Sequence, residues 1–167
     1  MINSIYAPPL NLRRSREIAI TLPLERLAGT RQAPLTKGTI LIVNDCPPLR
    51  DILSRMLVEA RYRVESVSGG WEAVTKSHFH PPDLILLDAD LPVVNGVEAY
   101  SQLRQEPTTR HLPIILTSVY ETYLSSYLVK AGGSIDFLAI PASYETLLGR
   151  VEQWMRRVGS ELDPSLN

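Results

Sequence analysis

The sequence contains one cysteine, Cys46, in 167 residues, which excludes an internal disulfide and a cysteine metal cluster. Its apolar runs are all much shorter than the roughly 18 residues that a membrane-spanning helix needs. No apolar segment follows a basic start, as it would in a secretory signal, and no glycine-rich phosphate loop is present. Together these absences predict a cytoplasmic protein without a membrane span.

Charge is present in ordinary amounts but is unevenly distributed along the chain. The whole chain has 17 Lys and Arg against 18 Asp and Glu, a net charge of −1. Residues 1–37 hold six of the basic and two of the acidic side chains, a charge of +4, which leaves −5 for residues 38–167. Such a basic extension can contact a nucleic acid, an acidic partner or its own domain, and a solvated, poorly ordered leader is equally compatible with it. Within it, residues 18–22 alternate as a short strand would, with disorder as the competing interpretation.

The most informative stretch is 82–92, in which four consecutive aliphatic residues run directly into the carboxylate of Asp88. A short apolar run bounded by prolines is typical of a strand buried on both faces, as in a parallel sheet. A carboxylate at the C-terminal tip of such a strand lies where open α/β sheets bind their ligands. The Asn95-Gly96 pair that follows is a turn signal. We therefore predict that Asp88 is the functional residue.

From residue 39 onward the sequence alternates between strand and helix patterns. Strands are predicted over 39–43, 63–67, 84–88, 111–118 and 135–140. Helices are predicted over 47–60, 71–80, 96–105, 120–131 and 144–158, the last of them ended by Gly159. Five strands alternating with five helices imply βαβ units with right-handed crossovers, and hence a parallel sheet with helices on both faces. The carboxyl ends of the strands would then gather polar side chains in one ligand crevice. These side chains are Asn44, Asp45, Asp88 and Thr117.

The order and spacing of four motifs within residues 38–159 resemble the receiver domain of bacterial two-component response regulators. The motifs are Ile-Leu-Ile-Val-Asn44-Asp45, Asp88-Ala-Asp90-Leu-Pro92-Val-Val-Asn95-Gly96, Pro-Ile-Ile-Leu-Thr117 and Phe137-Leu-Ala-Ile140-Pro141. The resemblance implies a flavodoxin-like α/β fold, a doubly wound five-stranded parallel sheet of order 2-1-3-4-5 with helices on both faces. It also implies a place in a phosphorelay, with phosphoryl transfer from a histidine kinase or a phosphotransfer protein to an aspartate.

The resemblance also implies roles for individual residues. By position, Asp88 corresponds to the phospho-acceptor, and Thr117 to the hydroxyl that hydrogen-bonds a phosphoryl oxygen. The implied ligands of a Mg²⁺ ion are Asp45, Asp88 and the backbone carbonyl of Asp90, with Asn44 adjacent and at most an indirect ligand. The chemistry needs such a cation because a carboxylate must approach an anionic phosphoryl group.

Two positions depart from the family pattern. Ile140 stands where the family has a lysine that pairs with the phosphoryl oxygens, and Asn44 stands in place of one of the usual two acids after the first strand. Together the two changes remove one cation and one anion, so they leave no unbalanced charge in the unphosphorylated site. The phosphorylated state, however, loses a charge-assisted contact. We expect Asp88 to accept phosphate, with Mg²⁺ binding weaker than usual or absent and with a weakened or rewired switch. The alternative is a phosphorylation-independent pseudo-receiver that acts as a structural or adaptor subunit.

Contacts with other proteins are expected to carry the signal. Tyr120, Tyr123 and Tyr127 recur at helical spacing in the segment that forms a partner or dimer face in the family, and tyrosine suits interfaces. Ordinary half-buried packing of these tyrosines is the alternative. The extension 1–37 is a second candidate for docking a downstream target, and homodimerisation is a further possibility. Because only the tail 160–167 follows the receiver, we expect a stand-alone regulator, neither an enzyme nor a direct DNA-binding protein.

Overall fold

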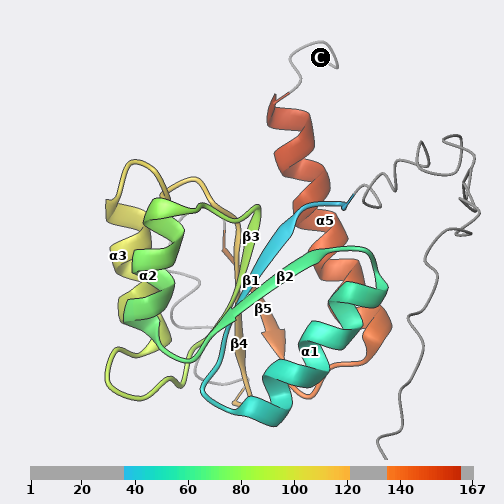
Figure 1. The fold of residues 1–167 in the computed structure, drawn as a ribbon, viewed down its shortest axis with the longest axis horizontal. Helices are drawn as coiled ribbons and strands as arrows, with labels where there is room; N and C mark the ends of the chain where they lie inside the picture. The colour runs from blue at the N-terminus through green and yellow to red at the C-terminus, as the bar shows by residue number, and fades with distance from the viewer. Residues whose placement is uncertain (1–35, 121–134, 163–167) are drawn as a thin grey trace, which may run out of the picture. The chain divides into compact units, whose positions relative to one another are not determined.

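The computed structural model describes residues 36–120 and 135–162, and within them five parallel strands form one sheet of order β2-β1-β3-β4-β5 (Figure 1). The strands are β1 (Thr39–Val43), β2 (Arg63–Val67), β3 (Leu84–Asp88), β4 (Ile114–Ser118) and β5 (Ile135–Ala139). The helices in the described residues are α1 (Pro47–Glu59), α2 (Gly70–Phe79), α3 (Gly96–Gln105) and α5 (Tyr144–Leu162). The predicted fold class and strand order are confirmed.

The sheet is the middle layer of three, with α1 and α5 against one face and α2 and α3 against the other (Figure 1). Side chains of a strand alternate between the two faces, so β1 and β3 contribute to both cores. Ile40 and Ile42 pack in the cluster under α1 and α5, whereas Leu41 and Val43 pack in the cluster under α2 and α3. Burial on both faces explains why the central strands read as continuous apolar runs rather than as alternating ones.

The predicted bounds of β1, β2, β3 and α3 agree with the structure, those of α1, α2 and β5 differ from it by one residue, and two further bounds differ by more. The fourth strand begins at Ile114 rather than at residue 111, because the Leu112 N–H donates to the Thr109 carbonyl in a turn, 3.0 Å away. The last helix continues to Leu162, so Gly159 does not end it. A glycine costs a helix only about 1 kcal/mol relative to alanine, which the neighbouring turns can outweigh.

Two predictions fall on residues that the structure does not describe. They are the helix over 120–131, beyond its first residue, and the strand pattern over 18–22. Within the described ranges, each helix is either too short or too polar to cross a membrane.

Candidate functional site

The carboxyl edge of the sheet brings together the side chains that end β1, β3 and β4. Asp88 is the last residue of β3, and its Cα partner across the ladder is Thr117 of β4. Asn44 directly follows β1, and its backbone N–H donates to the Val67 carbonyl of β2, 3.2 Å away. Asn44, Asp88 and Thr117 are all buried, which is unusual for polar side chains and demands hydrogen-bond partners.

The Asp88 carboxylate is only 8% exposed, and both of its oxygens are held. Its Oδ2 atom accepts a hydrogen bond from Asn44 Nδ2 at 2.6 Å, and its Oδ1 atom accepts one from the backbone N–H of Asp90 at 2.9 Å. Two donors, one after β1 and one after β3, therefore fix the plane of this carboxylate before any ligand binds.

The electrostatic surroundings of Asp88 disfavour its charged form. Burial raises the pKa of Asp88 above its ordinary value, and the carboxylates of Asp90 and Asp45 raise it further. The Asp90 N–H and the Asn44 amide act in the opposite direction, because both donate to the charged form. Among the described residues, the groups that shift this pKa include no lysine or arginine. A cation entering the site would thus relieve a repulsion that the described residues leave unbalanced.

Asn44 is held in one orientation. Its Oδ1 atom accepts the backbone N–H of Cys46 at 2.8 Å, while its Nδ2 atom donates to Asp88. Turning the amide over would place a donor against a donor and an acceptor against an acceptor, so only this assignment satisfies both contacts. The Asn44 side chain therefore presents its amide nitrogen, a hydrogen-bond donor, to the Asp88 carboxylate.

The carboxylates of Asp45 and Asp90 lie on loops at the same edge. Asp45 is exposed. The Asp90 Oδ2 atom accepts a hydrogen bond from Ser118 Oγ at 2.7 Å, and Ser118 Oγ in turn accepts the backbone N–H of Tyr120 at 2.9 Å. Ser118 thereby ties the loop after β3 to the loop after β4. Ser118 was not predicted as a site residue, although a second hydroxyl directly after Thr117 at the end of a strand was a visible signal.

The loop between Asp88 and α3 depends on Gly96. A Cβ atom on Gly96 would lie 1.9 Å from the Asp88 carbonyl oxygen, and the Gly96 N–H donates to the Ala89 carbonyl at 3.2 Å. Asn95 caps α3, because its Oδ1 atom accepts the Glu98 N–H at 2.9 Å. Asn95 is thus the cap of α3. Gly96 allows the backbone to pass close to the Asp88 carbonyl.

Ile140 directly follows β5 at the same edge of the sheet. Its side chain is 7% exposed, and its backbone N–H donates to the Ser118 carbonyl at 3.0 Å. The peptide bond between Ile140 and Pro141 is cis. The position at which the family pattern has a lysine is therefore a buried apolar position in this chain.

The donor set of the site fits Mg²⁺ better than a metal that needs an all-protein cage. In the described ranges, no cluster of three or more His, Cys, Asp or Glu side chains converges to hold a metal ion. Mg²⁺ usually keeps several waters and takes only one or two carboxylates, which Asp45 and Asp88 can supply. The unbalanced negative charge around Asp88 supports the same assignment.

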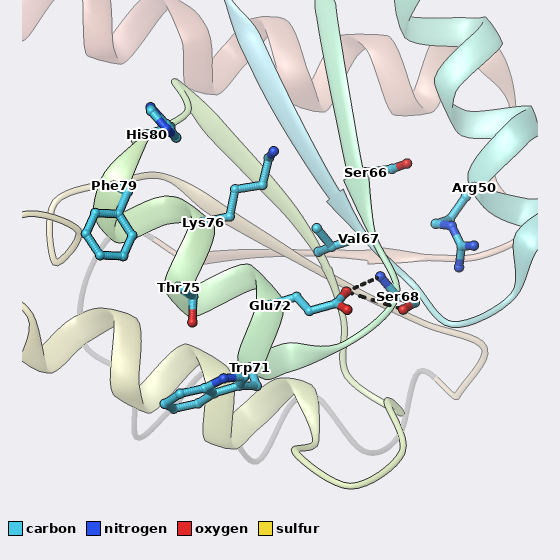
Figure 2. A pocket seen from close by; sticks show the side chains of 10 residues that line it. All are labelled: Arg50, Ser66, Val67, Ser68, Trp71, Glu72, Thr75, Lys76, Phe79 and His80. Atoms are coloured by element: carbon cyan, nitrogen blue, oxygen red, sulfur yellow. Dashed lines mark hydrogen bonds between the residues drawn. The ribbon is translucent and has the colours of Figure 1, made fainter.

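A broad groove lies elsewhere, over the edge strand β2 between α2 and the start of α1 (Figure 2). Its volume is about 770 Å³, and the exposed rings of Trp71 and Phe79 stand along its α2 side. The Glu72 carboxylate accepts both the backbone N–H and the hydroxyl of Ser68, which closes the turn into α2. None of Asn44, Asp45, Asp88 or Thr117 lines this groove, but Arg50, which does line it, donates a hydrogen bond to the Asn44 carbonyl.

The three histidines and the cysteine lie at the surface, whereas Trp154 lies in the core. His78, His80 and His111 are exposed, and so is Cys46. Trp154 lies in the core between α5 and the sheet, and its Nε1 donates to Asp136 at 3.0 Å. Tyr120 is exposed next to the exposed Val119, whereas Tyr123 and Tyr127 lie outside the described residues.

Comparisons with known proteins agree with this geometry. The family model described as the response regulator receiver domain matches residues 40–152. Protein PilH of Pseudomonas aeruginosa is 31% identical over 109 residues, which cover 65% of this chain and 90% of PilH. A probable cyclic di-GMP phosphodiesterase of Vibrio cholerae is 28% identical over 138 residues, 83% of this chain and 31% of that protein. The chain thus spans about a third of this longer relative.

A solved structure provides a further comparison. The receiver domain of a sensor histidine kinase from Pseudomonas aeruginosa, solved with a magnesium ion coordinated in its active site cleft, superposes with a TM-score of 0.65. It is 29% identical in sequence, and the match covers 71% of this chain and 97% of that domain.

Proposed function

Because the chain belongs to the response regulator receiver family, we propose that Asp88 accepts a phosphoryl group from a histidine kinase or a phosphotransfer protein. The observation that carries this proposal is the state of the Asp88 carboxylate. It lies at the tip of a buried strand, is 8% exposed, and is held by hydrogen bonds to both oxygens. A carboxylate that served only packing would not need to be oriented at the open edge of the sheet.

The proposed step forms one bond and breaks one. An oxygen of the Asp88 carboxylate bonds to phosphorus while the N–P bond of a phosphohistidine breaks, and the electron pair of that bond stays on the leaving imidazole. The residues that would hold Mg²⁺ are Asp45, Asp88 and the backbone carbonyl of Asp90, and the ion would neutralise the charge between carboxylate and phosphoryl group. The magnesium in the active site cleft of the Pseudomonas receiver supports this assignment.

Thr117 is proposed to hydrogen-bond a phosphoryl oxygen. It is the cross-strand partner of Asp88, and the Ala89 N–H donates to its carbonyl at 2.9 Å. Neighbouring strands lie about 4.8 Å apart, so a group bound to Asp88 comes within reach of a hydroxyl on the next strand.

We propose that the signal leaves the receiver through protein–protein contacts. The match to 90% of PilH supports a receiver that works without a fused output domain. Candidate docking surfaces for a downstream target or a second copy are the face that includes Tyr120, Tyr123 and Tyr127 and the basic extension 1–37. Deleting residues 1–37 should weaken binding of the downstream partner. An unchanged dissociation constant would show that the extension does not dock that partner.

The test of the acceptor role is calorimetric titration of Mg²⁺ and then of beryllofluoride, an acyl-phosphate mimic, into the full chain. We expect Mg²⁺-dependent binding of beryllofluoride by the wild type and no binding by Asp88→Asn. Asp51→Asn is the matched control, because Asp51 is exposed on α1 and carries the same change of charge. Absence of binding by the wild type would contradict phospho-acceptance.

That outcome would favour the second candidate function, a phosphorylation-independent pseudo-receiver that acts as a structural or adaptor subunit. The observation in its favour is the burial of Ile140 in place of the family's lysine. Partner binding would then be unchanged in Asp88→Asn.

A further inference from the structure

The groove over β2 lies at an unpaired edge of the sheet. In the described part of the chain, β2 pairs on one side only, in parallel with β1. The Arg63 N–H donates to a carbonyl just before β1, and the Val67 carbonyl accepts an N–H just after β1. Alternate residues of a strand direct their backbone groups to the same neighbour in a parallel ladder, so the N–H and C=O groups of Val64 and Ser66 point away from β1. An edge that leaves such groups unpaired is a template for a further strand.

Two aromatic rings stand beside this edge. Trp71 and Phe79 on α2 are 65% and 70% exposed, although large aromatic side chains gain much from burial. They lie on one side of the helix with the exposed Thr75 between them, at the spacing i, i+4 and i+8. At 1.5 Å per residue the rings are about 12 Å apart along the helix, which is the length of roughly four residues of an extended chain.

The opposite side of the groove carries a cation without a carboxylate partner. Arg50, at the start of α1, lies across β2 from the two rings (Figure 2). Its Nη1 atom donates to the Asn44 carbonyl at 2.5 Å, which holds the guanidinium in place. None of the salt bridges among the described residues includes Arg50. A guanidinium has five N–H donors, so further donors of Arg50 can bind a carboxylate.

The other charged side chains of the groove have partners nearby. Its lining holds two basic side chains, Arg50 and Lys76, and one acidic side chain, Glu72, and is therefore positive on balance. Lys76 forms a salt bridge with Glu65 at 3.0 Å. The Glu72 carboxylate accepts the N–H and the hydroxyl of Ser68. The charge that is left for a ligand is thus that of Arg50.

We propose that this groove binds an extended, acidic segment of a partner protein, which adds to the sheet as a further strand beside β2. The backbone of the segment pairs with the outward N–H and C=O groups of β2. Side chains on one face of the added strand contact the two rings of α2, and a carboxylate on its other face pairs with Arg50. A helix or a small molecule would leave the backbone groups of the edge unpaired, so the observations favour an extended segment. Binding in this groove is independent of phospho-acceptance by Asp88.

The test uses the full chain and a synthetic probe, the capped peptide Thr-Ile-Glu-Thr-Glu-Ile-Thr. Its side chains read the same in both directions, so it suits parallel and antiparallel pairing alike. The two isoleucines lie four positions apart on one face of a strand, as the spacing of the rings requires, and the glutamates lie on the other face. We expect saturable one-to-one binding by calorimetry. Absence of saturable binding at about 1 mM probe would overturn the proposal.

Hydrogen exchange measured by NMR locates the bound probe on β2. The amides of Val64 and Ser66 should exchange at least tenfold more slowly when the probe is saturating, because they gain hydrogen-bond acceptors. The Glu65 amide is directed to β1 and should not change. Unchanged exchange at both Val64 and Ser66 would contradict strand addition.

Matched substitutions test the two sides of the groove. We expect Trp71→Ala and Arg50→Gln each to weaken binding of the probe at least tenfold. Tyr120→Ala and Arg55→Gln are the controls, because both residues are exposed and neither lines the groove. A probe with glutamines in place of its glutamates should bind the wild type more weakly, whereas Arg50→Gln should bind both probes equally. If each variant bound the probe as its control does, the proposal would be wrong.

N-methylation of the probe tests backbone pairing directly. In an added strand, the N–H groups of alternate residues point to the sheet and the others point to solvent. Methylating one alternate set of nitrogens should abolish binding, and methylating the other set should preserve it. Equal effects of the two sets would exclude pairing with β2. Sedimentation of the wild type is the last control, because a dimer that the probe dissociates would assign the groove to a second copy of this chain and overturn the proposal.

Discussion

The loop behind Asp88 can be tested by adding a single methyl group at Gly96. A Cβ there would lie 1.9 Å from the Asp88 carbonyl oxygen and 2.7 Å from both the Ala89 Cα and the Asp88 carbonyl carbon. Carbon atoms in contact lie about 3.5 Å apart or more, so the loop would have to move by roughly 1.5 Å. All three atoms belong to the backbone, and no side chain can rotate away to make room.

The expected loss of stability follows from that clash. Overpacking of this kind typically costs about 1–3 kcal/mol, so we expect Gly96→Ala to lower the free energy of unfolding by about 2 kcal/mol. For a domain of this size that corresponds to a fall in melting temperature of about 4–8 °C. Urea unfolding followed by circular dichroism would measure the first quantity, and a thermal melt the second.

The same substitution should damage the site more than the fold. The displaced segment carries the Asp90 N–H, which holds Asp88 Oδ1 at 2.9 Å. A shift of about 1 Å in a positioned group can cost about a hundredfold in reactivity, and we expect a loss of beryllofluoride affinity of similar order. Gly149→Ala is the control, because a Cβ on Gly149 meets nothing within 4 Å and lies within α5, where alanine should stabilise by up to about 1 kcal/mol. A Gly96→Ala protein as stable as the wild type, with unchanged beryllofluoride affinity, would refute this reasoning.

Three further predictions concern the same edge of the sheet. Because burial raises the pKa of Asp88 in the folded state, the folded protein binds its proton more tightly than the unfolded chain, and stability falls as pH rises from the unfolded pKa through the folded one. Asp88→Asn should therefore be more stable than the wild type at pH 7 in denaturant unfolding, and this advantage should vanish at about pH 3, below both pKa values. Ser118→Ala removes the donor to Asp90 and the acceptor of the Tyr120 N–H, so the free energy of unfolding should fall by about 1–2 kcal/mol. Ser101→Ala, at an exposed position of α3, should change it little. Val93 has a φ of +67° and is fully exposed, so Val93→Asn should raise the free energy of unfolding by about 0.5–1 kcal/mol, and a decrease would show that the loop is not strained there.

The strands were predictable because their causes are local in the sequence. Leu84 to Leu87 form an apolar run that begins after Pro82 and ends in Asp88, and burial on both faces requires that composition. The start of β4 was missed because Leu112 and Pro113 are as apolar as the strand itself. What excludes Leu112 from the strand is its hydrogen bond to Thr109, a turn contact that composition does not encode.

The positions of the site residues were also predictable, but their contacts were not. Each predicted residue lies within two positions of the carboxyl end of a strand, and the parallel topology alone places these strand ends at one edge. The orientation of Asn44 depends on two groups, Cys46 N–H and Asp88 Oδ2, whose distances only the folded chain defines. The contact between Ser118 and Asp90 joins residues 28 positions apart on different loops, so no local pattern indicates it. The cap at Asn95 did have a local signal, because Glu98 follows it at the third helical position, as in a capping box.

The three carboxylates of the site are stabilised in three different ways, and none of these places a cation beside Asp88. Asp88 is oriented by two N–H donors, Asp90 by the Ser118 hydroxyl, and Asp45 is exposed to water. Burial, together with the carboxylates of Asp90 and Asp45, raises the pKa of Asp88 by more than the two hydrogen bonds lower it. The described part of the site therefore orients two of its carboxylates by hydrogen bonds to neutral donors. A divalent cation would complete it, and the orienting contacts mean that little rearrangement of Asp88 would be needed for that cation to bind.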